Sequence, residues 1–593
     1  MNRPDLRDIN VTLVETLEEA HDFLYWLQQR RPILAIDTEC TGLKWWTPNF
    51  VRLIQFGDGE RAYCLGAKEW GQVIVDALTL IRDSNVPVAM HNAKFDQHAI
   101  ESMGWPTIGW HNVYDTMVMD HLCYPIRSHG LKRMGYRVYG PSATVGESVL
   151  KAHFKEHKLG WATIPITEPC YYAYGGMDTV LTARFAEDLG RELSQRGLLP
   201  AFERESTVQK IAYGMESRGL RIDTEYTQQL KDQWAEEMVA LRLQLDAWGV
   251  ANPSSKAQVV QALHLKEDWD PEEFTETGEP KLTKNIMAAM DSQIAPLVLR
   301  YKRLVKWSEA YLSHFLNEQG PTGVVHPSIR TLGARTGRMS ITAPALQTLP
   351  SKEASIRSCI LPREGEVLWA ADYDAMELRV MAHYSQDPGL VTLFQEGLDP
   401  HSYAASVVYG LPYEELVAGQ HKGQRSTAKN TVFSRIYGAG AAKIAETAGV
   451  PPHQIEEFMR IYDTRFPGVK RFMDSTQDTA RYRMLNEGEP YVTTAYGRWL
   501  NVEPDSLFKL VNYVVQGTCA DLLKDRLVAI DRLGLSECIM IPVHDELIMS
   551  IPEGDTEMAD EIRQTMEEHE RFAVPLTCGL EGPFTNWGGA YGS

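Results

Sequence analysis

An acid ends the apolar run Val367-Leu368-Trp369-Ala370-Ala371-Asp372 in the middle of the chain. Short apolar runs of this kind predict buried strands, so Asp372 is expected at the end of a core strand. A second acid, Asp545, lies between the apolar runs 539–543 and 547–551, which predict a hairpin with Asp545 at its tip. Either acid alone could be an ordinary turn former, because Asp is common in turns.

A predicted helix between these strands carries a stripe of unlike side chains. Every fourth position is occupied in turn by Arg425, Lys429, Phe433 and Tyr437. A helix advances by about 100° per residue, so each step of four drifts by about 40° and the stripe is about 120° wide. Two cations followed by two aromatic rings do not make a packing face. The order suits a triphosphate on the cations and a base against the rings.

Three ordered motifs carry a family resemblance. The sequence contains Asp-Tyr-x-x-x-Glu-Leu-Arg at 372–379, Arg-x-x-x-Lys-x-x-x-Phe-x-x-x-Tyr-Gly at 425–438 and Val-His-Asp-Glu at 543–546. This set resembles motifs A, B and C of the family A DNA polymerases, the bacterial DNA polymerase I (Klenow-like) class. The likeness runs from about residue 30 to the C-terminus and extends through Thr336-Gly337-Arg338-Met339-Ser340, Leu346-Gln347, Ile356-Arg357-Ser358, Asp399-Pro400-His401, Tyr496-Gly497-Arg498 and Gln516-Gly517-Thr518.

This resemblance implies template-directed DNA synthesis and a role for each matching position. Asp372 and Asp545 are expected to hold two Mg²⁺ ions, which Mn²⁺ can replace, with Glu546 as a further catalytic acid. Lys429 is expected to act also as a general acid toward pyrophosphate. The implied nucleotide-binding positions are Tyr373, Glu377, His401, Arg425, Lys429, Phe433 and Tyr437. The implied DNA-binding positions are Arg338, Arg379, Asn512, Gln516 and His544.

Two positions sharpen the expected substrate. Glu377 matches the family position that rejects a 2'-hydroxyl, which favours DNA over RNA synthesis. Phe433 stands where a Tyr hydroxyl can replace a missing 3'-hydroxyl, so discrimination against dideoxynucleotides is expected. Two departures, Phe508 and Trp499, occupy positions where many relatives have Arg, and they leave the template contacts open.

The N-terminal part carries acids of its own. Strands are predicted at 32–36, 51–56 and 86–90, and Asp37 and Glu39 follow the first of them. Because side chains alternate along a strand, both carboxylates point to one side. Two acids on one face repel each other unless a cation such as Mg²⁺ lies between them. A solvated Asp-x-Glu at a strand end is the alternative for this motif alone.

Later residues complete an ordered set of acids. Asn92-Ala93-Lys94-Phe95-Asp96 follows the third predicted strand, Asp115 lies further on, and Tyr174-Gly175-Gly176-Met177-Asp178 begins a helical stretch. The order resembles the DnaQ-like (DEDDy) 3'-5' exonucleases. That resemblance implies that Tyr174 orients an attacking water and that two metal ions are held by Asp37, Glu39, Asp96 and Asp178. It also implies DNA contacts from Leu43 and Asn92.

The combined expectation is an α/β and α+β multidomain protein. An RNase H-like 3'-5' exonuclease domain is expected at 1–198, followed by a right-hand polymerase fold. The thumb is expected at 199–325, because 201–316 is rich in helix-forming residues and is interrupted by a polar loop at 276–280. The other expected boundaries are 326–387 for the first part of the palm, 388–499 for the fingers and 500–593 for the second part of the palm.

Bulk composition sets broad limits. A chain of 593 residues exceeds the size of a single core, so two or more domains are expected. The net charge of −20 argues against a nucleic-acid partner, but Lys and Arg cluster locally and metal-binding acids add negative charge. The eight cysteines form no Cys-x-x-Cys pair and are expected to be reduced and mostly buried. No apolar run approaches the roughly 20 residues that cross a bilayer, so a cytoplasmic location is expected.

The expected partners are primer-template DNA, dNTPs and a single-stranded DNA 3' end, with no membrane. The chain is expected to act as a monomer, with replication accessory proteins as further partners. No 5' nuclease domain precedes the first exonuclease strand, which favours a bacteriophage replication enzyme. A free-standing exonuclease with a nucleic-acid-binding extension would explain 31–190 only, and Glu377 argues against a single-subunit RNA polymerase.

Overall fold

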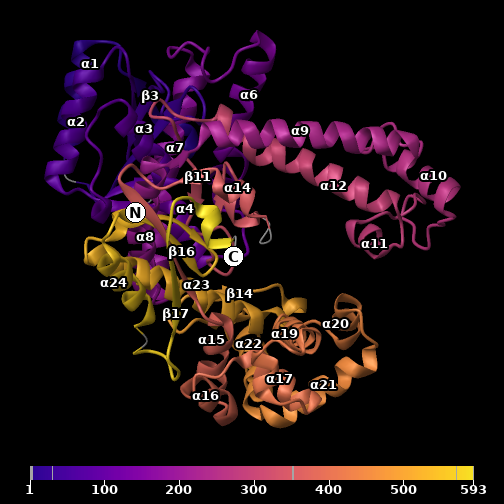
Figure 1. The fold of residues 1–593 in the computed structure, drawn as a ribbon. Helices are drawn as coiled ribbons and strands as arrows, with labels where there is room; N and C mark the ends of the chain where they lie inside the picture. Colours follow the sequence, from indigo (N-terminus) through magenta and orange to yellow (C-terminus); the bar gives the residue numbers. More distant parts are fainter. Residues whose placement is uncertain (1–3, 30, 350–352, 569, 592–593) are drawn as a thin grey trace.

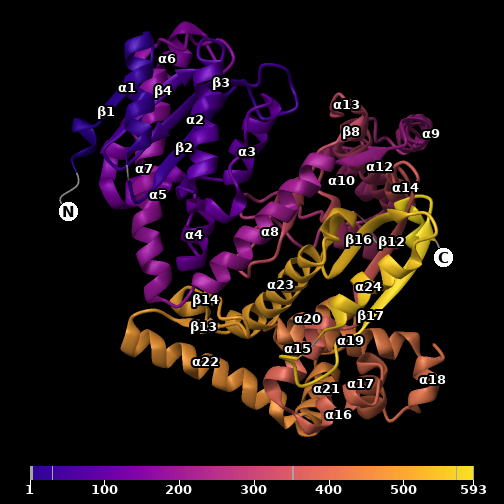
Figure 2. The ribbon, with the colours of Figure 1, turned by 90° about the vertical axis from the view of Figure 1, so that its left-hand side faces the viewer.

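The computed structural model describes residues 4–29, 31–349, 353–568 and 570–591 (Figure 1). The N-terminal part forms an α/β body, two long helices project from the middle of the molecule, and the C-terminal half combines a sheet with a helical lobe (Figures 1 and 2). Among the described residues, no helix is long and apolar enough to cross a membrane. All eight cysteines are free and most are buried, as the sequence predicts.

A mixed six-stranded sheet, of order β1-β4-β3-β2-β5-β6, forms the centre of the N-terminal body. Strand β2 runs antiparallel to β3 and parallel to β5. The three predicted strands correspond to β2, β3 and β5, while β1, β4 and β6 were not predicted. The bounds are β1 (Asn10–Leu13), β2 (Leu34–Cys40), β3 (Val51–Gly57), β4 (Arg61–Gly66), β5 (Val88–Met90) and β6 (Val113–Asp115).

Helices cover this sheet and build its cores. One core joins the sheet to α1 and α2 through side chains such as Phe23, Phe56 and Ile74. The longest helix, α7, packs against β1, β2, β3, β4 and β5, so it spans the sheet. The bounds are α1 (Leu17–Gln28), α2 (Gly71–Ser84), α3 (Ala93–Ser102), α4 (Thr116–Cys123), α5 (Leu131–Tyr139), α6 (Val145–His157) and α7 (Pro169–Gln195).

The middle of the chain is helical, as predicted. Helices α9 and α12 run side by side as the projecting arm, and the α10–α11 region closes its tip around a small core that includes Leu245, Leu263 and Val298 (Figure 1). The polar loop predicted at 276–280 is present there. The bounds are α8 (Leu199–Arg218), α9 (Thr224–Ala247), α10 (Lys256–Glu267), α11 (Lys284–Ala289), α12 (Ile294–Trp307), the π-helix η4 (Ser308–Ser313) and α13 (His314–Asn317).

The core of the C-terminal half is a four-stranded antiparallel sheet of order β15-β16-β12-β17. Helices α8 and α24 contact this sheet, and α23 packs against both helices. The apolar runs at 367–371, 539–543 and 547–551 lie in β12, β15 and β16, as expected. The bounds are β12 (Glu366–Tyr373), α23 (Lys509–Arg532), β15 (Ile539–Val543), β16 (Glu546–Pro552), α24 (Thr556–Glu567) and β17 (Cys578–Phe584).

A helical lobe is inserted between β12 and α23, in agreement with the prediction for 388–490. Asp387 and Asp399 each accept backbone hydrogen bonds at a helix start and are followed by Pro, a combination that favours helix initiation. The bounds are α15 (Met376–Ser385), α16 (Pro388–Gln395), α17 (Pro400–Tyr409), α18 (Tyr413–Val417), α19 (Lys422–Ile436), α20 (Ala441–Ala448), α21 (Pro452–Arg465) and α22 (Pro467–Glu487).

Short elements connect these parts. The strands are β7 (Leu220–Ile222), β8 (Val324–Val325), β9 (Ser328–Arg330), β10 (Ser340–Thr342), β11 (Ile360–Leu361), β13 (Tyr491–Thr493) and β14 (Trp499–Asn501). The short helices are η1 (Leu6–Asp8), η2 (Trp110–Asn112), η3 (Gly140–Ala143), η5 (Leu346–Thr348), α14 (Ala354–Ser358), η6 (Pro504–Ser506), η7 (Ser536–Cys538) and η8 (Trp587–Tyr591).

A buried charge network joins α8 to α23. Glu205 contacts Arg498 and accepts a hydrogen bond from Lys524 at 2.6 Å, while Asp521 accepts from Arg498 at 2.6 Å. These side chains are at most 1% exposed. Burial would raise the pKa of Asp521, but Arg498 and Arg204 lower it to about 2. The network therefore fixes α8, and with it the N-terminal body, against the C-terminal half.

We expect Glu205→Gln to destabilise the chain by about 3–5 kcal/mol, because it leaves Lys524 and part of the Arg498 charge buried without a counter-charge. Urea unfolding followed by tryptophan fluorescence measures the change. Glu503→Gln is the matched control, since Glu503 pairs with Arg335 at 2.8 Å in an exposed position, where ion pairs contribute about 1 kcal/mol or less. Equal effects of the two variants would contradict the role given to the buried network.

Candidate active sites

The first candidate site lies where β2 meets α7. Strand β2 continues beyond the predicted 32–36, so Asp37 and Glu39 lie within it rather than after it. Both still point to one side, and Asp178 of α7 joins them, with carboxylate oxygens of the three within 4.8 Å of one another. Gly175 permits this close approach of helix and sheet, because a β-carbon there would lie 2.5 Å from the Gln55 side chain.

Asp96, the fourth predicted ligand, lies beside this group rather than within it. It is buried in the first turn of α3 and accepts a hydrogen bond from the Thr38 hydroxyl at 2.7 Å. Burial raises the pKa of Asp96 to about 7. The structure thus brings three of the four predicted carboxylates together and places the fourth next to them.

The acids of this site are electrostatically unfavourable without a cation. Burial, followed by the neighbouring carboxylates, raises the pKa of both Asp37 and Glu39 well above the usual range. Lys132 of α5 compensates in part, because its ammonium contacts Asp178 and lies 4.0 Å from the ring centroid of Tyr174. All the available ligand atoms are carboxylate oxygens, which are the donors that Mg²⁺ prefers. The residues therefore fit a divalent cation.

Tyr174 lies one turn before Asp178 on α7, so both side chains share one helix face, as predicted. Leu43 lies in the loop after β2 and is 82% exposed, which leaves it free to contact a ligand. Asn92 precedes α3 in a left-handed conformation with a φ of 68°.

Asp115 has a structural role in this arrangement. Its carboxylate accepts hydrogen bonds from the backbone N–H groups of Asn92, Ala93 and Met117, and from the Gln209 amide at 2.9 Å. These bonds occupy both carboxylate oxygens. Asp115 therefore holds the starts of α3 and α4 together and is not one of the acids grouped around Asp37, Glu39 and Asp178.

The second candidate site lies where β12 meets the β15–β16 hairpin. Asp372 is the penultimate residue of β12 and lies opposite Glu546 in the antiparallel register with β16. Asp545 belongs to the two-residue turn before Glu546, as predicted, and His544 in that turn adopts a φ of 60°. A cavity of about 390 Å³ is lined by all three acids and by Asp374. The fold thus unites acids that are far apart in sequence.

The carboxylates around this cavity also disfavour one another's charge. Burial raises the pKa of Asp372 to about 7, with Asp545 and Glu546 adding to the effect. Burial likewise raises the pKa of Asp545 and brings that of Glu546 to about 7. As at the first site, clustered carboxylate oxygens fit a divalent cation, which would restore their charged state.

Glu546 is held from the other side by the C-terminus of the described chain. The Tyr591 hydroxyl donates a hydrogen bond to Glu546 Oε2 at 2.5 Å, and the Arg357 guanidinium lies 4.0 Å from the Tyr591 ring centroid. This bond orients Glu546 next to the Asp372 and Asp545 pair. Tyr591 carries no motif signal in the sequence and is found only through the fold.

The predicted stripe is present on α19, although Tyr437 lies just beyond the last helical residue. The Arg425 guanidinium donates to the Asp399 carboxylate at 3.1 Å, and the Phe433 ring centroid lies 5.4 Å from that of His401. Lys429 is exposed on the same stripe. Burial, with the nearby Lys429 and Arg425 charges, lowers the pKa of His401 to about 4.

The end of the stripe reaches the second site through Glu377. Tyr437 donates to both carboxylate oxygens of Glu377 at 3.2 Å, and Arg338 donates to Glu377 Oε1 at 2.6 Å. Glu377 lies in the first turn of α15, directly after the strand that carries Asp372. The aromatic end of the stripe is therefore anchored close to the paired acids.

Comparison with known proteins identifies this arrangement. Residues 224–589 match the family model described as DNA polymerase family A. The chain belongs to this family. Residues 11–194 match the model described as 3'-5' exonuclease, so this family A DNA polymerase carries an exonuclease domain before its polymerase fold.

Similar proteins occur in phages and bacteria. A DNA polymerase of Mycobacterium phage D29 is 29% identical, with 99% of this chain and 98% of that protein covered. DNA polymerase I of Chloroflexus aurantiacus is 29% identical over 97% of this chain but only 63% of its own length. A solved polymerase domain of Pol1 from M. smegmatis, 22% identical, shares the fold with a TM-score of 0.79 over 98% of this chain and all of that chain.

Two side chains that the family resemblance implied as contacts have partners within the chain. Tyr373 follows Asp372 on β12 and so points to the opposite side of the strand, where its buried hydroxyl donates to the Met566 carbonyl at 2.6 Å. Arg379 is buried, and its guanidinium donates to the carbonyls of Asp374 and Pro575 and to the Thr577 hydroxyl. Both side chains thus have structural contacts within the chain, and the nucleotide-binding role of Tyr373 and the DNA-binding role of Arg379 stay predictions.

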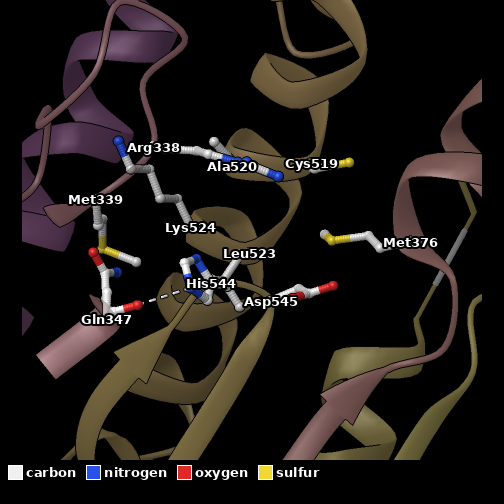
Figure 3. A pocket seen from close by; sticks show the side chains of 10 residues that line it. All are labelled: Arg338, Met339, Gln347, Met376, Cys519, Ala520, Leu523, Lys524, His544 and Asp545. Carbon is white, nitrogen blue, oxygen red and sulfur yellow. Dashed lines mark hydrogen bonds between the residues drawn. The ribbon is translucent and has the colours of Figure 1, made fainter. Parts of the chain in front are cut away.

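Two other predicted DNA contacts of this family A polymerase, Arg338 and His544, lie beside Asp545. Figure 3 shows a cavity lined by Arg338, Met339, Gln347, Met376, Cys519, Ala520, Leu523, Lys524, His544 and Asp545. The His544 ring nitrogen Nε2 lies 3.1 Å from the Gln347 carbonyl oxygen. Gln516 contacts the Tyr437 hydroxyl, and the buried Asn512 amide nitrogen has no partner within the described part of the chain.

The two departures from the family pattern have packing explanations. Phe508 precedes α23 and lies against Gly438 at the end of α19, where a β-carbon would meet its ring at 3.1 Å. Trp499 stacks on Tyr491 with ring centroids 3.9 Å apart, and the Arg196 guanidinium lies 4.8 Å from its ring. Both aromatic residues thus pack against other parts of the chain.

Proposed function

We propose that the Asp372–Asp545 site extends a DNA primer from dNTPs on a template strand, and that the Asp37–Glu39–Asp178 site removes nucleotides from a DNA 3' end as proofreading. The observation that carries the proposal is the presence of two separate groups of paired acids, of which one is linked through Glu377 and Tyr437 to the cation-aromatic stripe. The solved Pol1 domain that shares this fold is described as a complex with DNA primer-template and dNTP.

Two Mg²⁺ ions are proposed for each site, with Mn²⁺ as a substitute. Asp372 and Asp545 would hold them in the polymerase site, and Asp37, Glu39 and Asp178, with Asp96 beside them, in the exonuclease site. When bound, such ions activate the attacking oxygen and neutralise the leaving oxygen of an in-line displacement. The fit rests on the raised pKa values of these clustered carboxyl groups, which a divalent cation would lower.

The chain's own residues then bind and orient the reactants. Arg425, Lys429 and His401 are proposed to bind the triphosphate, with Lys429 donating a proton to pyrophosphate, and Phe433 and Tyr437 to lie beside the sugar and base. Arg425 is already oriented by Asp399, so its guanidinium is directed rather than free to rotate. In the exonuclease site Tyr174 would orient the attacking water, and Leu43 and Asn92 would contact the strand end.

Glu377 is proposed to exclude a ribose 2'-hydroxyl, because Arg338 and Tyr437 hold its carboxylate in one position. We expect Glu377→Ala to raise the ratio of ribonucleotide to deoxynucleotide incorporation by about tenfold or more. Without the Glu377 carboxylate nothing would clash with a ribose 2'-hydroxyl, so the discrimination between the two nucleotides would be lost. Single-nucleotide incorporation kinetics measure the ratio. Glu396→Ala, an exposed acid just after α16, is the control and should leave the ratio unchanged.

Phe433 is proposed to set the response to dideoxynucleotides. We expect Phe433→Tyr to increase chain termination by dideoxynucleotides by about tenfold or more, because a hydroxyl added there can replace the hydrogen bond of the missing 3'-hydroxyl. Termination ladders on a primed template provide the measurement. The exchange Phe274→Tyr, at an exposed position between α10 and α11, controls for a general effect of an added hydroxyl, and unaltered termination by Phe433→Tyr would refute the role.

The proposed function is tested by incubating the chain with a labelled primer-template, with and without dNTPs and Mg²⁺, on one gel. Longer products with dNTPs, shorter products without them, and neither without the metal are expected. Excision without any extension would support a nuclease alone.

We further propose, on the similarity to phage polymerases, that the enzyme replicates a phage genome in the host cytoplasm. The monomeric state and the involvement of accessory proteins stay predictions, which light scattering and pull-down experiments can check.

A further inference from the structure

A second group of metal-ligating side chains lies in the exonuclease domain, away from its acids. Ligand atoms of His153 on α6, and of Glu168 and Cys170 at the start of α7, lie within 4.8 Å of one another. His153 Nε2 and Glu168 Oε2 are 3.9 Å apart. All three residues are partly buried and so remain accessible to an ion. The group offers one nitrogen, one oxygen and one sulfur ligand.

A second imidazole, that of His157, lies next to this group but is not part of it. His157 follows His153 by four residues, which places both imidazoles on one helix face. Their ring centroids are 4.1 Å apart and their planes are inclined by 24°. Stacked, nearly parallel rings direct their nitrogens along parallel lines rather than toward one ion, and His157 Nδ1 lies 3.2 Å from the His153 backbone carbonyl oxygen. His157 therefore packs against His153, and the group has three protein donors, which leaves a fourth position for water.

The donors lie at the two ends of the connection between α6 and α7, residues 158–168. Arg52 anchors this connection by donating to the carbonyls of Trp161 and Ile164, at 2.6 and 2.5 Å. The Trp161 ring centroid lies 5.8 Å from that of Tyr174. An ion bound by both ends would close the connection and so hold Trp161 against Tyr174.

The same helix stripe links the group to the exonuclease acids. Cys170, Tyr174 and Asp178 follow one another at intervals of four residues on α7, so a ligand at Cys170 lies one turn from Tyr174 and two turns from Asp178. Fixing the first turn of α7 to α6 would limit motion of the turns that follow. An ion bound at the first turn of α7 would therefore restrict the position of Tyr174 in the next turn.

We propose that His153, Glu168 and Cys170, with water in the fourth position, bind a zinc ion that clips the 158–168 connection and positions Tyr174. Zinc is borderline soft, favours four-coordinate sites and takes imidazole, thiolate and carboxylate ligands, whereas Mg²⁺ prefers oxygen ligands alone. Binding replaces the thiol proton of Cys170, which is released to solvent. Closing an eleven-residue connection at its base also removes chain entropy from the unclipped state.

Cobalt substitution of the full-length chain tests the binding. Co²⁺ bound to a thiolate gives a charge-transfer absorption that carboxylate sites lack, so we expect the band in the wild type and about one tightly held Zn²⁺ per chain by metal analysis after dialysis. The band should persist in Asp37→Ala/Glu39→Ala, which disrupts the acid site, and in Cys538→Ser, the other partly buried cysteine. Cys170→Ser should abolish it. A wild type without the band, or a band that survives Cys170→Ser, overturns the proposal.

The positioning effect rests on the proposed exonuclease function and is measured separately. We expect His153→Ala to slow single-strand excision about tenfold while primer extension is retained, the size of loss typical of residues that orient a catalytic group. Adding Zn²⁺ to wild type from which a chelator has removed the zinc should restore excision, and adding it to His153→Ala treated in the same way should not. Equal excision by zinc-free and zinc-loaded wild type overturns the positioning role. A wild type that shows the cobalt band but no excision at all contradicts the proposed function instead.

Discussion

Asp545→Asn should lower primer extension by about a thousandfold while leaving single-strand excision intact. The exchange keeps the size of the side chain but removes one of the two negative charges, those of Asp372 and Asp545, that are proposed to hold the metal ions at this cavity. Metal-held carboxylates supply several kcal/mol of transition-state stabilisation, and each 1.4 kcal/mol changes a rate about tenfold. Single-turnover extension of a labelled primer measures the loss, and digestion of a single strand measures what remains.

Asp374→Asn is the matched control for this variant. Asp374 lines the same cavity, but its carboxylate accepts a hydrogen bond from the Thr577 hydroxyl at 2.8 Å and it is not one of the proposed ligands. It should therefore reduce extension by only a few-fold, on the scale of roughly 1 kcal/mol for one hydrogen bond. Comparable losses in the two variants would mean that the cavity needs negative charge in general rather than a ligand at Asp545.

Asp37→Ala/Glu39→Ala should have the converse effect. It removes two of the three carboxylates that lie within 4.8 Å of one another, so excision should fall by about a thousandfold or more while extension is retained. Degradation of a 3'-labelled single strand is the assay. Extension should survive because the polymerase acids belong to a different sheet.

The chain provides a control with the same residue types at the same spacing. Asp58 and Glu60 lie in the turn between β3 and β4, where the Asp58 carboxylate accepts backbone hydrogen bonds from Glu60 and Arg61. Asp58→Ala/Glu60→Ala should leave excision within a few-fold of wild type, because these acids form a turn and hold no metal. If this variant lost excision as completely as Asp37→Ala/Glu39→Ala, the assignment of the exonuclease ligands would be wrong.

The apolar strands β2, β3, β5, β12, β15 and β16 could be predicted from the sequence, whereas β4 was missed although five of its residues are buried. Other strands could not be predicted for local reasons. The sequence pattern makes β2 too short, because Asp37 and Glu39 interrupt its apolar run even though both pair with β3 in the sheet. Strand β6 has only three residues, and β1 has four, with a single fully buried side chain. Such short or mixed segments give no clear period-two pattern. Whether these segments form strands depends on their pairing with strands that are distant in the sequence.

The candidate sites divide in a similar way. The stripe from Arg425 to Tyr437 could be predicted, because helix periodicity is local. Lys132 and Tyr591 could not, because one contacts Asp178 and the other Glu546 only after folding. The family resemblance places Tyr373 and Arg379 at matching positions, but the internal hydrogen bonds of their side chains are seen only after folding.

The central claim is that one chain uses two separate acid sites, one to remove nucleotides from a DNA 3' end and one to extend a primer. A primer with a mismatched 3' nucleotide tests it directly, followed on one gel with Mg²⁺ and all four dNTPs. We predict that the wild type removes the mismatch and then extends the primer, that Asp545→Asn only shortens it, and that Asp37→Ala/Glu39→Ala removes nothing. Extension of the shortened primer by Asp545→Asn, or removal of the mismatch by Asp37→Ala/Glu39→Ala, would contradict the account.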